Sequence, residues 1–176
     1  MGLKAIVIVA VIATLLFFPQ STFAQETGLS VTISNKEERE IRLEQFLTAH
    51  RSPLAPYSHS LISTADKYQL DWRLIPAVSG VESSFALAMP ADSYNAYGWQ
   101  NGQTRFASWE DSFEIVAKTL KNNYVDKGLD TVAKISRVYA PPSQTWAKNV
   151  QFFIDEINNF PVENNPNNQT TLPLYL

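Results

Sequence analysis

The chain has 176 residues, of which 45% are hydrophobic and 18% charged, with a formal net charge of −3 and no cysteine. The absence of cysteine excludes a disulfide framework, a thiolate zinc site and cysteine catalysis. Two histidines are too few for a multi-histidine metal site, so we expect no metal and no other cofactor. A negative net charge without a basic run argues against a nucleic-acid partner. Ten Phe, seven Tyr and four Trp exclude a chain that is disordered throughout.

The N-terminus has the features of a secretory signal peptide. Lys4 precedes an apolar run over residues 5–18, and small residues follow at Thr22 and Ala24. This pattern predicts a signal peptide over residues 1–24, cleaved after Ala24. At 1.5 Å per residue the apolar run spans about 21 Å, short of the roughly 30 Å of a bilayer core, which favours cleavage over an uncleaved anchor. In either case we expect the rest of the chain to be secreted or in the cell envelope, with membrane contact only through an uncleaved N-terminus.

The remaining sequence predicts a mainly α-helical domain. Residues 25–56 are expected to form a short linker, over 25–33, and an N-terminal helix. Residues 57–160 form the domain proper, and residues 161–176, rich in Asn and Pro, form a disordered tail. Apolar spacing and breaker residues predict helices at about 34–50, 58–69, 71–85, 108–128, 130–139 and 143–157.

Three residues are suited to begin these helices. Asp71, Ser108 and Ser143 each stand where an N-cap is expected. The apolar stripes of the helices that follow the last two include Trp109 and Trp146, which we therefore assign to the core.

One small β-hairpin is expected between the third and fourth helices. Residues 94–99 and 104–107 flank Asn101-Gly102, the strongest short hairpin-turn signal in the chain.

One carboxylate occupies an apolar position on the third helix. Glu82 comes seven residues after Ile75 and four after Val78, on the same helical face as Phe85. Burying a carboxylate is costly unless it is paired, and a carboxylic acid is what protonation of a glycosidic oxygen requires. The alternative is that Glu82 only reaches solvent at the helix end or caps a backbone amide.

Four segments in the same order resemble the lysozyme-like superfamily. Residues 71–85 are similar to the helix that ends in Glu-Ser-x-Phe/Trp in soluble lytic transglycosylases and autolysin-type glucosaminidases. Residues 95–99, Asn-Ala-Tyr-Gly-Trp, resemble the glucosaminidase Asn-x-Phe-Gly-Ile segment, and residues 106–112 resemble the entry into its next helix. Tyr-Ala-Pro at 139–141, followed by Trp146 and Val150, resembles the closing pattern. The match covers roughly residues 57–157, and four weak motifs in order are fairly specific.

The resemblance implies a lysozyme-like helical domain that cleaves the β-1,4 glycan strands of peptidoglycan. Glu82 would be the general acid, and Tyr139 would contact the sugar or stabilise developing positive charge. The resemblance assigns substrate binding to Ser83, Asn95, Tyr97, Gly98 and Trp99. For the rings of Tyr97 and Trp99, ordinary core packing is an equal alternative.

The sequence departs from the glucosaminidase pattern at the second acid. Many members of that family carry one in the hairpin region, but residues 100–105 contain no carboxylate, and Asp92, Glu110 and Asp111 lie outside it. A single acid suffices if the substrate's own N-acetyl group or its C6 hydroxyl attacks the anomeric carbon. The main prediction is an endo-β-N-acetylglucosaminidase. The alternatives are a lytic transglycosylase or muramidase on the same scaffold, an inactive cell-wall-binding module, and a helical interaction domain.

Overall fold

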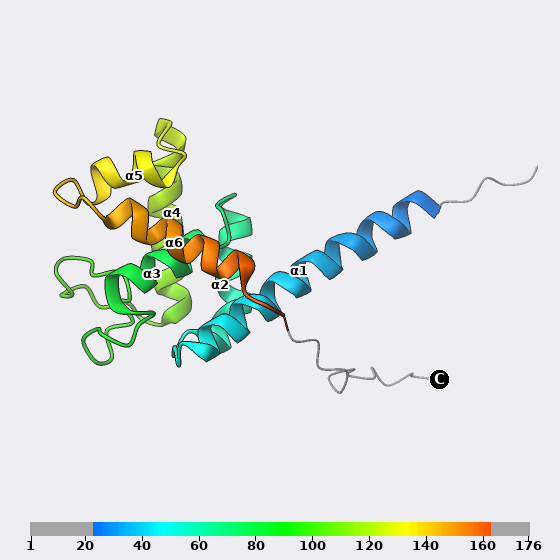
Figure 1. Cartoon of the computed structure of the whole chain (residues 1–176), viewed down its shortest axis with the longest axis horizontal. Helices are drawn as coiled ribbons and strands as arrows, with labels where there is room; N and C mark the ends of the chain where they lie inside the picture. Colours follow the sequence, from blue (N-terminus) through cyan, green and yellow to red (C-terminus); the bar gives the residue numbers. More distant parts are fainter. Residues whose placement is uncertain (1–22, 163–176) are drawn as a thin grey trace, which may run out of the picture.

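Within residues 23–162, which are the residues that the structure describes, the computed structural model has six α-helices and two short 3-10 helices (Figure 1). The mainly α prediction is therefore confirmed. The elements in chain order are α1 (Phe23–Ala49), η1 (Ala55–Tyr57), α2 (Ser58–Lys67), α3 (Leu74–Ser83), α4 (Trp109–Asn123), η2 (Val125–Lys127), α5 (Val132–Tyr139) and α6 (Trp146–Asn159).

Helix α1 begins earlier than predicted, at Phe23 rather than at Ser34, so the stretch expected as a linker is helical. Its first part projects from the domain (Figure 1). Residues 25–33 carry no apolar period in the sequence, so helical spacing could not predict this part. The second part packs through Leu43, Phe46 and Leu47.

Two predictions fall largely outside the described residues. These are the signal peptide, of which residues 1–22 are not described, and the disordered tail, of which residues 163–176 are not described. None of the helices in the described part of the chain has both the length and the apolar character needed to cross a bilayer.

Helix α3 lies at the centre of the domain. It packs against α6 and also contacts α2 and α4. Eight of its ten residues are buried, because a helix that is covered on several sides needs apolar or small residues all round. Gly80 is required for this packing, since a Cβ there would lie 2.6 Å from the ring of Phe85.

The turn after α3 holds three consecutive non-glycine residues in the left-handed region. Ser84, Phe85 and Ala86 have φ of 52°, 57° and 68°, a conformation that costs energy for residues with a Cβ. Buried hydrogen bonds hold it in place. The hydroxyl of Ser83 accepts from the amide of Ala86 (2.9 Å), and that of Ser52 donates to the carbonyl of Phe85 (2.9 Å).

A loop over residues 84–108 connects α3 to α4 where the hairpin was predicted, and the described part of the chain contains no β-strand. In a hairpin, Trp99 and Thr104 would exchange two main-chain hydrogen bonds. Only one forms, from the Thr104 amide to the Trp99 carbonyl (3.3 Å). The Trp99 amide and the Thr104 carbonyl bond instead to the side chain of Asn95. The chain turns at Asn101-Gly102, as predicted. The side chain of Asn95, however, takes the hydrogen bonds that the two strands of a hairpin would make to each other.

Two of the three predicted N-caps differ from the prediction. The Ser108 side chain caps α4 by accepting from the Asp111 amide (3.2 Å), as predicted. Asp71 lies two residues before the N-cap of α3, where it accepts from the amide and the guanidinium of Arg73. Ser143 stands two residues before the N-cap of α6, and its hydroxyl accepts from the amide of Trp146 (3.0 Å).

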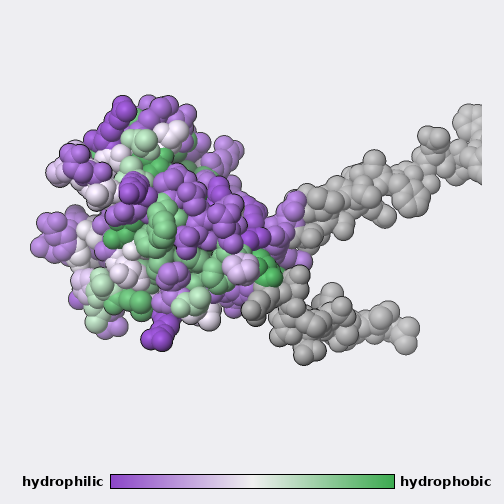
Figure 2. Space-filling model, viewed as in Figure 1, coloured by the Kyte–Doolittle hydropathy of each residue, from purple (hydrophilic) through white to green (hydrophobic). Residues whose placement is uncertain are grey.

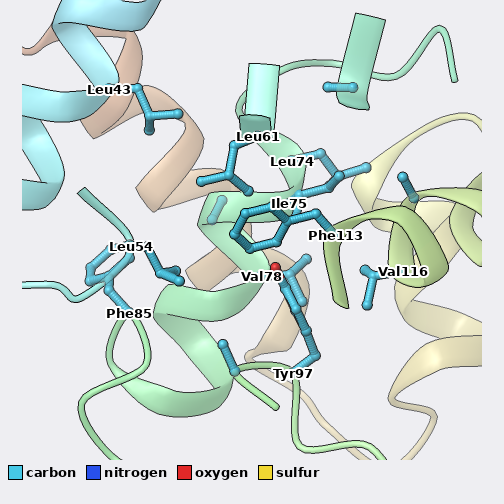
Figure 3. Packing of buried hydrophobic residues seen from close by; sticks show 14 of the residues in the cluster. Leu43, Leu54, Leu61, Leu74, Ile75, Val78, Phe85, Tyr97, Phe113 and Val116 are labelled. Carbon is cyan, nitrogen blue, oxygen red and sulfur yellow. The ribbon is translucent and has the colours of Figure 1, made fainter. Parts of the chain in front are cut away.

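Among the described residues, one buried side-chain polar atom has no hydrogen-bond partner, the hydroxyl of Tyr97. Tyr97 is 1% exposed and reaches into the cluster that holds Val78, Phe113 and Val116 (Figure 3). No described residue bonds to its hydroxyl, which is fully buried. Burial also raises the pKa of this hydroxyl, so it stays neutral.

Replacing Tyr97 by Phe is expected to stabilise the fold. A buried hydroxyl without a partner costs about 1–3 kcal/mol, so Tyr97→Phe should raise the free energy of unfolding by about 1 kcal/mol. Urea unfolding followed by circular dichroism measures the change. A loss of stability instead would mean that the hydroxyl has a partner in solution.

Among the described residues, large apolar side chains are exposed on several elements. The five largest exposed ones come from different segments, namely Ile41 (α1), Leu87 (the loop after α3), Ile115 (α4), Val138 (α5) and Phe152 (α6). On the face shown in Figure 2, apolar residues interrupt a mostly hydrophilic surface over α3 and α6.

Candidate functional site

A cleft of about 480 Å³ opens where the end of α3, the loop after it, the end of α5 and the start of α6 meet. Five of its ten lining residues are aromatic, and one is a carboxylate. The residues that line the cleft are Glu82, Tyr97, Gly98, Trp99, Gln100, Thr104, Tyr124, Tyr139, Ala140 and Trp146.

Glu82 is half-buried in the last turn of α3. One carboxylate oxygen, Oε1, accepts a hydrogen bond from the indole Nε1 of Trp146 at 2.7 Å. The contact exists because α3 packs along α6, which brings together residues 64 positions apart. Glu82 is therefore held in place by a neutral donor rather than by a salt bridge.

Tyr139 ends α5 and stands beside Trp146, with ring centroids 4.9 Å apart and an interplanar angle of 31°. Its hydroxyl donates to the carbonyl of Tyr97 at 3.3 Å. Burial raises the pKa of this hydroxyl, and the negative charge of Glu82 raises it further. Tyr139 therefore keeps its proton and acts as a hydrogen-bond donor at the cleft.

Gly98 brings the main chain close to Glu82. Its φ is +66°, and a Cβ at this position would lie 3.3 Å from Oε2 of Glu82. Glycine is thus needed both for the backbone conformation and for the space beside the carboxylate. The next residue, Trp99, is half-buried, and its ring lies 5.7 Å from that of Phe106.

Two predicted substrate-binding residues lie behind the cleft rather than in it. Ser83 is 4% exposed, and its hydroxyl donates to the carbonyl of Ala96 at 2.8 Å. Asn95 is 1% exposed, and its side chain bonds only to main-chain groups of Trp99 and Thr104. Both residues support the loop that forms one wall. Their direct contact with a substrate stays a prediction, and in this structure their polar atoms are already bonded within the protein.

Tyr97 belongs partly to the cleft and partly to the core behind it. It borders the cleft, but its side chain is buried in the core, as the alternative interpretation held. Its carbonyl, which accepts from Tyr139, is the polar group that it offers at this wall. The predicted set of seven residues thus divides into Glu82, Gly98, Trp99 and Tyr139 in the cleft and three residues that support it.

Sequence reasoning missed two aromatic residues of the cleft. Trp146 was assigned to the core; it is only 4% exposed, which confirms its burial, but its indole nitrogen bonds to Glu82. Tyr124 follows the last turn of α4, and its ring lies 6.2 Å from that of Tyr139. Helical periodicity indicates that such residues face inward, but it cannot distinguish the core from a cleft wall.

Glu82 is the one carboxylate among the described residues that line the cleft. Asp92 and Glu110 are exposed, and Asp111 accepts from the main-chain amide of Ala107 at 3.0 Å. None of the three belongs to the lining. The arrangement can therefore supply one proton donor, but no second carboxylate as partner.

Comparison with known proteins found no match, whether among family models, curated proteins or solved structures.

Proposed function

We propose that the protein is a glycosidase that cleaves the β-1,4 glycan strands of peptidoglycan, of the endo-β-N-acetylglucosaminidase type. The observation that carries the proposal is the single, firmly held carboxylate of Glu82 in an aromatic cleft. Aromatic rings with a few placed polar groups are typical of ligand sites, and rings can stack on the apolar faces of sugars. The predicted signal peptide supports a substrate outside the cytoplasmic membrane.

In the proposed reaction Glu82 protonates the glycosidic oxygen as the bond to the anomeric carbon breaks. The bonding electron pair leaves with that oxygen, and positive charge develops on the sugar. The lone carboxylate supports a route in which the substrate's own N-acetyl group attacks the anomeric carbon. Water then opens this intermediate, and Glu82, now a carboxylate, takes a proton from the water and is restored.

The same lone carboxylate also suits a lytic transglycosylase. There the C6 hydroxyl of the sugar attacks the anomeric carbon, and Glu82 takes the proton of that hydroxyl. The product is a 1,6-anhydro end instead of a reducing end. An inverting mechanism is less well supported, because it needs a second carboxylate about 6.5–9.5 Å from the first to activate water.

Mass spectrometry of the soluble products from purified peptidoglycan tests the proposal. Reducing N-acetylglucosamine ends are expected. Anhydro-N-acetylmuramic acid ends would instead indicate a transglycosylase, and reducing N-acetylmuramic acid ends a muramidase. If several types of cell wall yield no products but still bind the protein, the function is that of a binding module.

Tyr139→Phe is expected to lower turnover more than stability. Because the hydroxyl of Tyr139 donates its proton to the Tyr97 carbonyl, its oxygen is the atom that can face the positive charge developing on the sugar, and loss of one dipole aimed at developing charge costs roughly 100-fold or more in rate. Its hydrogen bond to the Tyr97 carbonyl contributes about 1 kcal/mol to stability.

Steady-state kinetics and thermal unfolding measure the two effects of Tyr139→Phe. Tyr94→Phe is the matched control, because Tyr94 packs on Trp109 outside the cleft lining. An unchanged rate in Tyr139→Phe would mean that this residue only packs in the core and takes no part in the reaction.

A further inference from the structure

The indole of Trp146 makes the two oxygens of Glu82 unequal. A tryptophan Nε1–H is a donor only, so the oxygen that it contacts, Oε1, must act as an acceptor. An oxygen that carries the carboxyl proton is the poorer acceptor. When Glu82 is protonated, its proton is therefore directed to Oε2.

The indole is itself fixed. Trp146 is 4% exposed, and its ring packs beside that of Tyr139 at 4.9 Å. Its main-chain amide donates to the hydroxyl of Ser143 at 3.0 Å, which holds the first turn of α6. Because the ring cannot turn away without leaving the core, its donor imposes one orientation on the Glu82 carboxyl group.

The other oxygen faces a position kept open by a missing side chain. Oε2 lies where a Cβ on Gly98 would come within 3.3 Å. No described residue donates a hydrogen bond to Oε2. This oxygen is thus the one that makes no hydrogen bond to a described residue, and it lies beside Gly98, which lines the cleft.

We propose that Trp146 is a positioning residue that assigns separate roles to the two oxygens of Glu82, with Oε2 as the proton-delivering atom. The inference rests on the proposed function. In the first step the proton moves from Oε2 to the glycosidic oxygen while the bond to the anomeric carbon breaks. The charge left on Glu82 is stabilised by the indole N–H, and Oε2 later accepts the proton of the attacking water or hydroxyl.

The proposal predicts a selective loss of turnover when the indole donor is removed. Two variants remove the donor: Trp146→Phe, and replacement of Trp146 by benzothienylalanine, which keeps the ring shape but has sulfur in place of N–H. Each should lower kcat about 10- to 100-fold. KM should stay within about 2-fold, because Trp146 is only 4% exposed, offers the substrate little surface and acts through Glu82. The benzothienyl variant should unfold at the wild-type temperature within a few degrees.

Trp109→Phe is the matched control for loss of a buried indole. Trp109 is 7% exposed, packs on Phe113 and does not line the cleft. This variant should lower the unfolding temperature without changing kcat. If the benzothienyl variant keeps the wild-type kcat, the donor has no role and the proposal is overturned.

An NMR measurement separates this proposal from the proposed function. The Nε1–H resonance of Trp146 should shift in Glu82→Gln, while that of Trp109 should not. If neither shifts, the contact is absent in solution and the proposal fails whatever the enzyme does. If the Trp146 resonance shifts but the wild-type protein releases no products from peptidoglycan, the proposed function fails and the catalytic role of Trp146 fails with it, although the contact stands.

Discussion

Glu82→Gln is expected to lower turnover on peptidoglycan by about 100- to 10,000-fold, the contribution of a positioned general acid. The amide cannot deliver a proton to a glycosidic oxygen. It can still accept the indole hydrogen bond of Trp146 through its carbonyl oxygen, so the packing between α3 and α6 should survive. Release of soluble fragments measures the rate, and thermal unfolding measures the fold.

The same substitution at an exposed glutamate outside the cleft provides the control. Glu110 is exposed in the first turn of α4 and is not part of the cleft lining. Glu110→Gln removes one negative charge, as Glu82→Gln does, and should keep full turnover. Binding of Glu82→Gln to insoluble peptidoglycan should remain close to that of the wild type. Full activity in Glu82→Gln would remove Glu82 from the mechanism.

The helices were largely predictable because each has a buried face. In α4 the cap at Ser108 and the apolar stripe through Phe113, Val116 and Leu120 agree with the sequence pattern. The first part of α1 was not predictable, because residues 25–33 carry no apolar period from which a helix could be detected. Local capping chemistry was less reliable, since Asp71 and Ser143 bond near helix starts without occupying the N-cap.

The candidate site was only partly predictable. The position of Glu82 on an apolar face could be deduced from spacing alone, and the structure places it in the cleft. The indole N–H of Trp146 could not be assigned to Glu82, because the contact depends on how two helices pack. The predicted hairpin is absent for a related reason. Asn-Gly favours a tight turn, but on both sides of that turn the side chain of Asn95 bonds to main-chain groups that paired strands would use.

Asn95 carries the second prediction with a large expected effect. Its Nδ2 donates to the carbonyls of Trp99 (3.0 Å) and Thr104 (3.1 Å), and its Oδ1 accepts from the Trp99 amide (3.1 Å). Asn95→Ala leaves the Trp99 amide and the Thr104 carbonyl without these partners, at about 1 kcal/mol each, whereas the Trp99 carbonyl still accepts from the amides of Gly102 and Thr104. The free energy of unfolding should therefore fall by about 2 kcal/mol. Urea unfolding measures the change.

Two further variants of the same loop sharpen this test. Asn95→Asp keeps the acceptor for the Trp99 amide but places an oxygen against two carbonyls, so it should destabilise the fold at least as much as Asn95→Ala. Gln103 is exposed in the same loop, and Gln103→Ala should change stability by no more than about 0.5 kcal/mol.

The effect on activity distinguishes support of the cleft wall from contact with the glycan. Gly98, Trp99 and Thr104 line the cleft, and the bonds of Asn95 hold this wall together. If Asn95 acts only through the wall, Asn95→Ala should lose stability and turnover together. If Asn95 instead binds the sugar directly, KM should rise about 10-fold or more while stability stays near that of the wild type. Since the Asn95 side chain is 1% exposed and its amide already bonds to the main chain, we expect the first result.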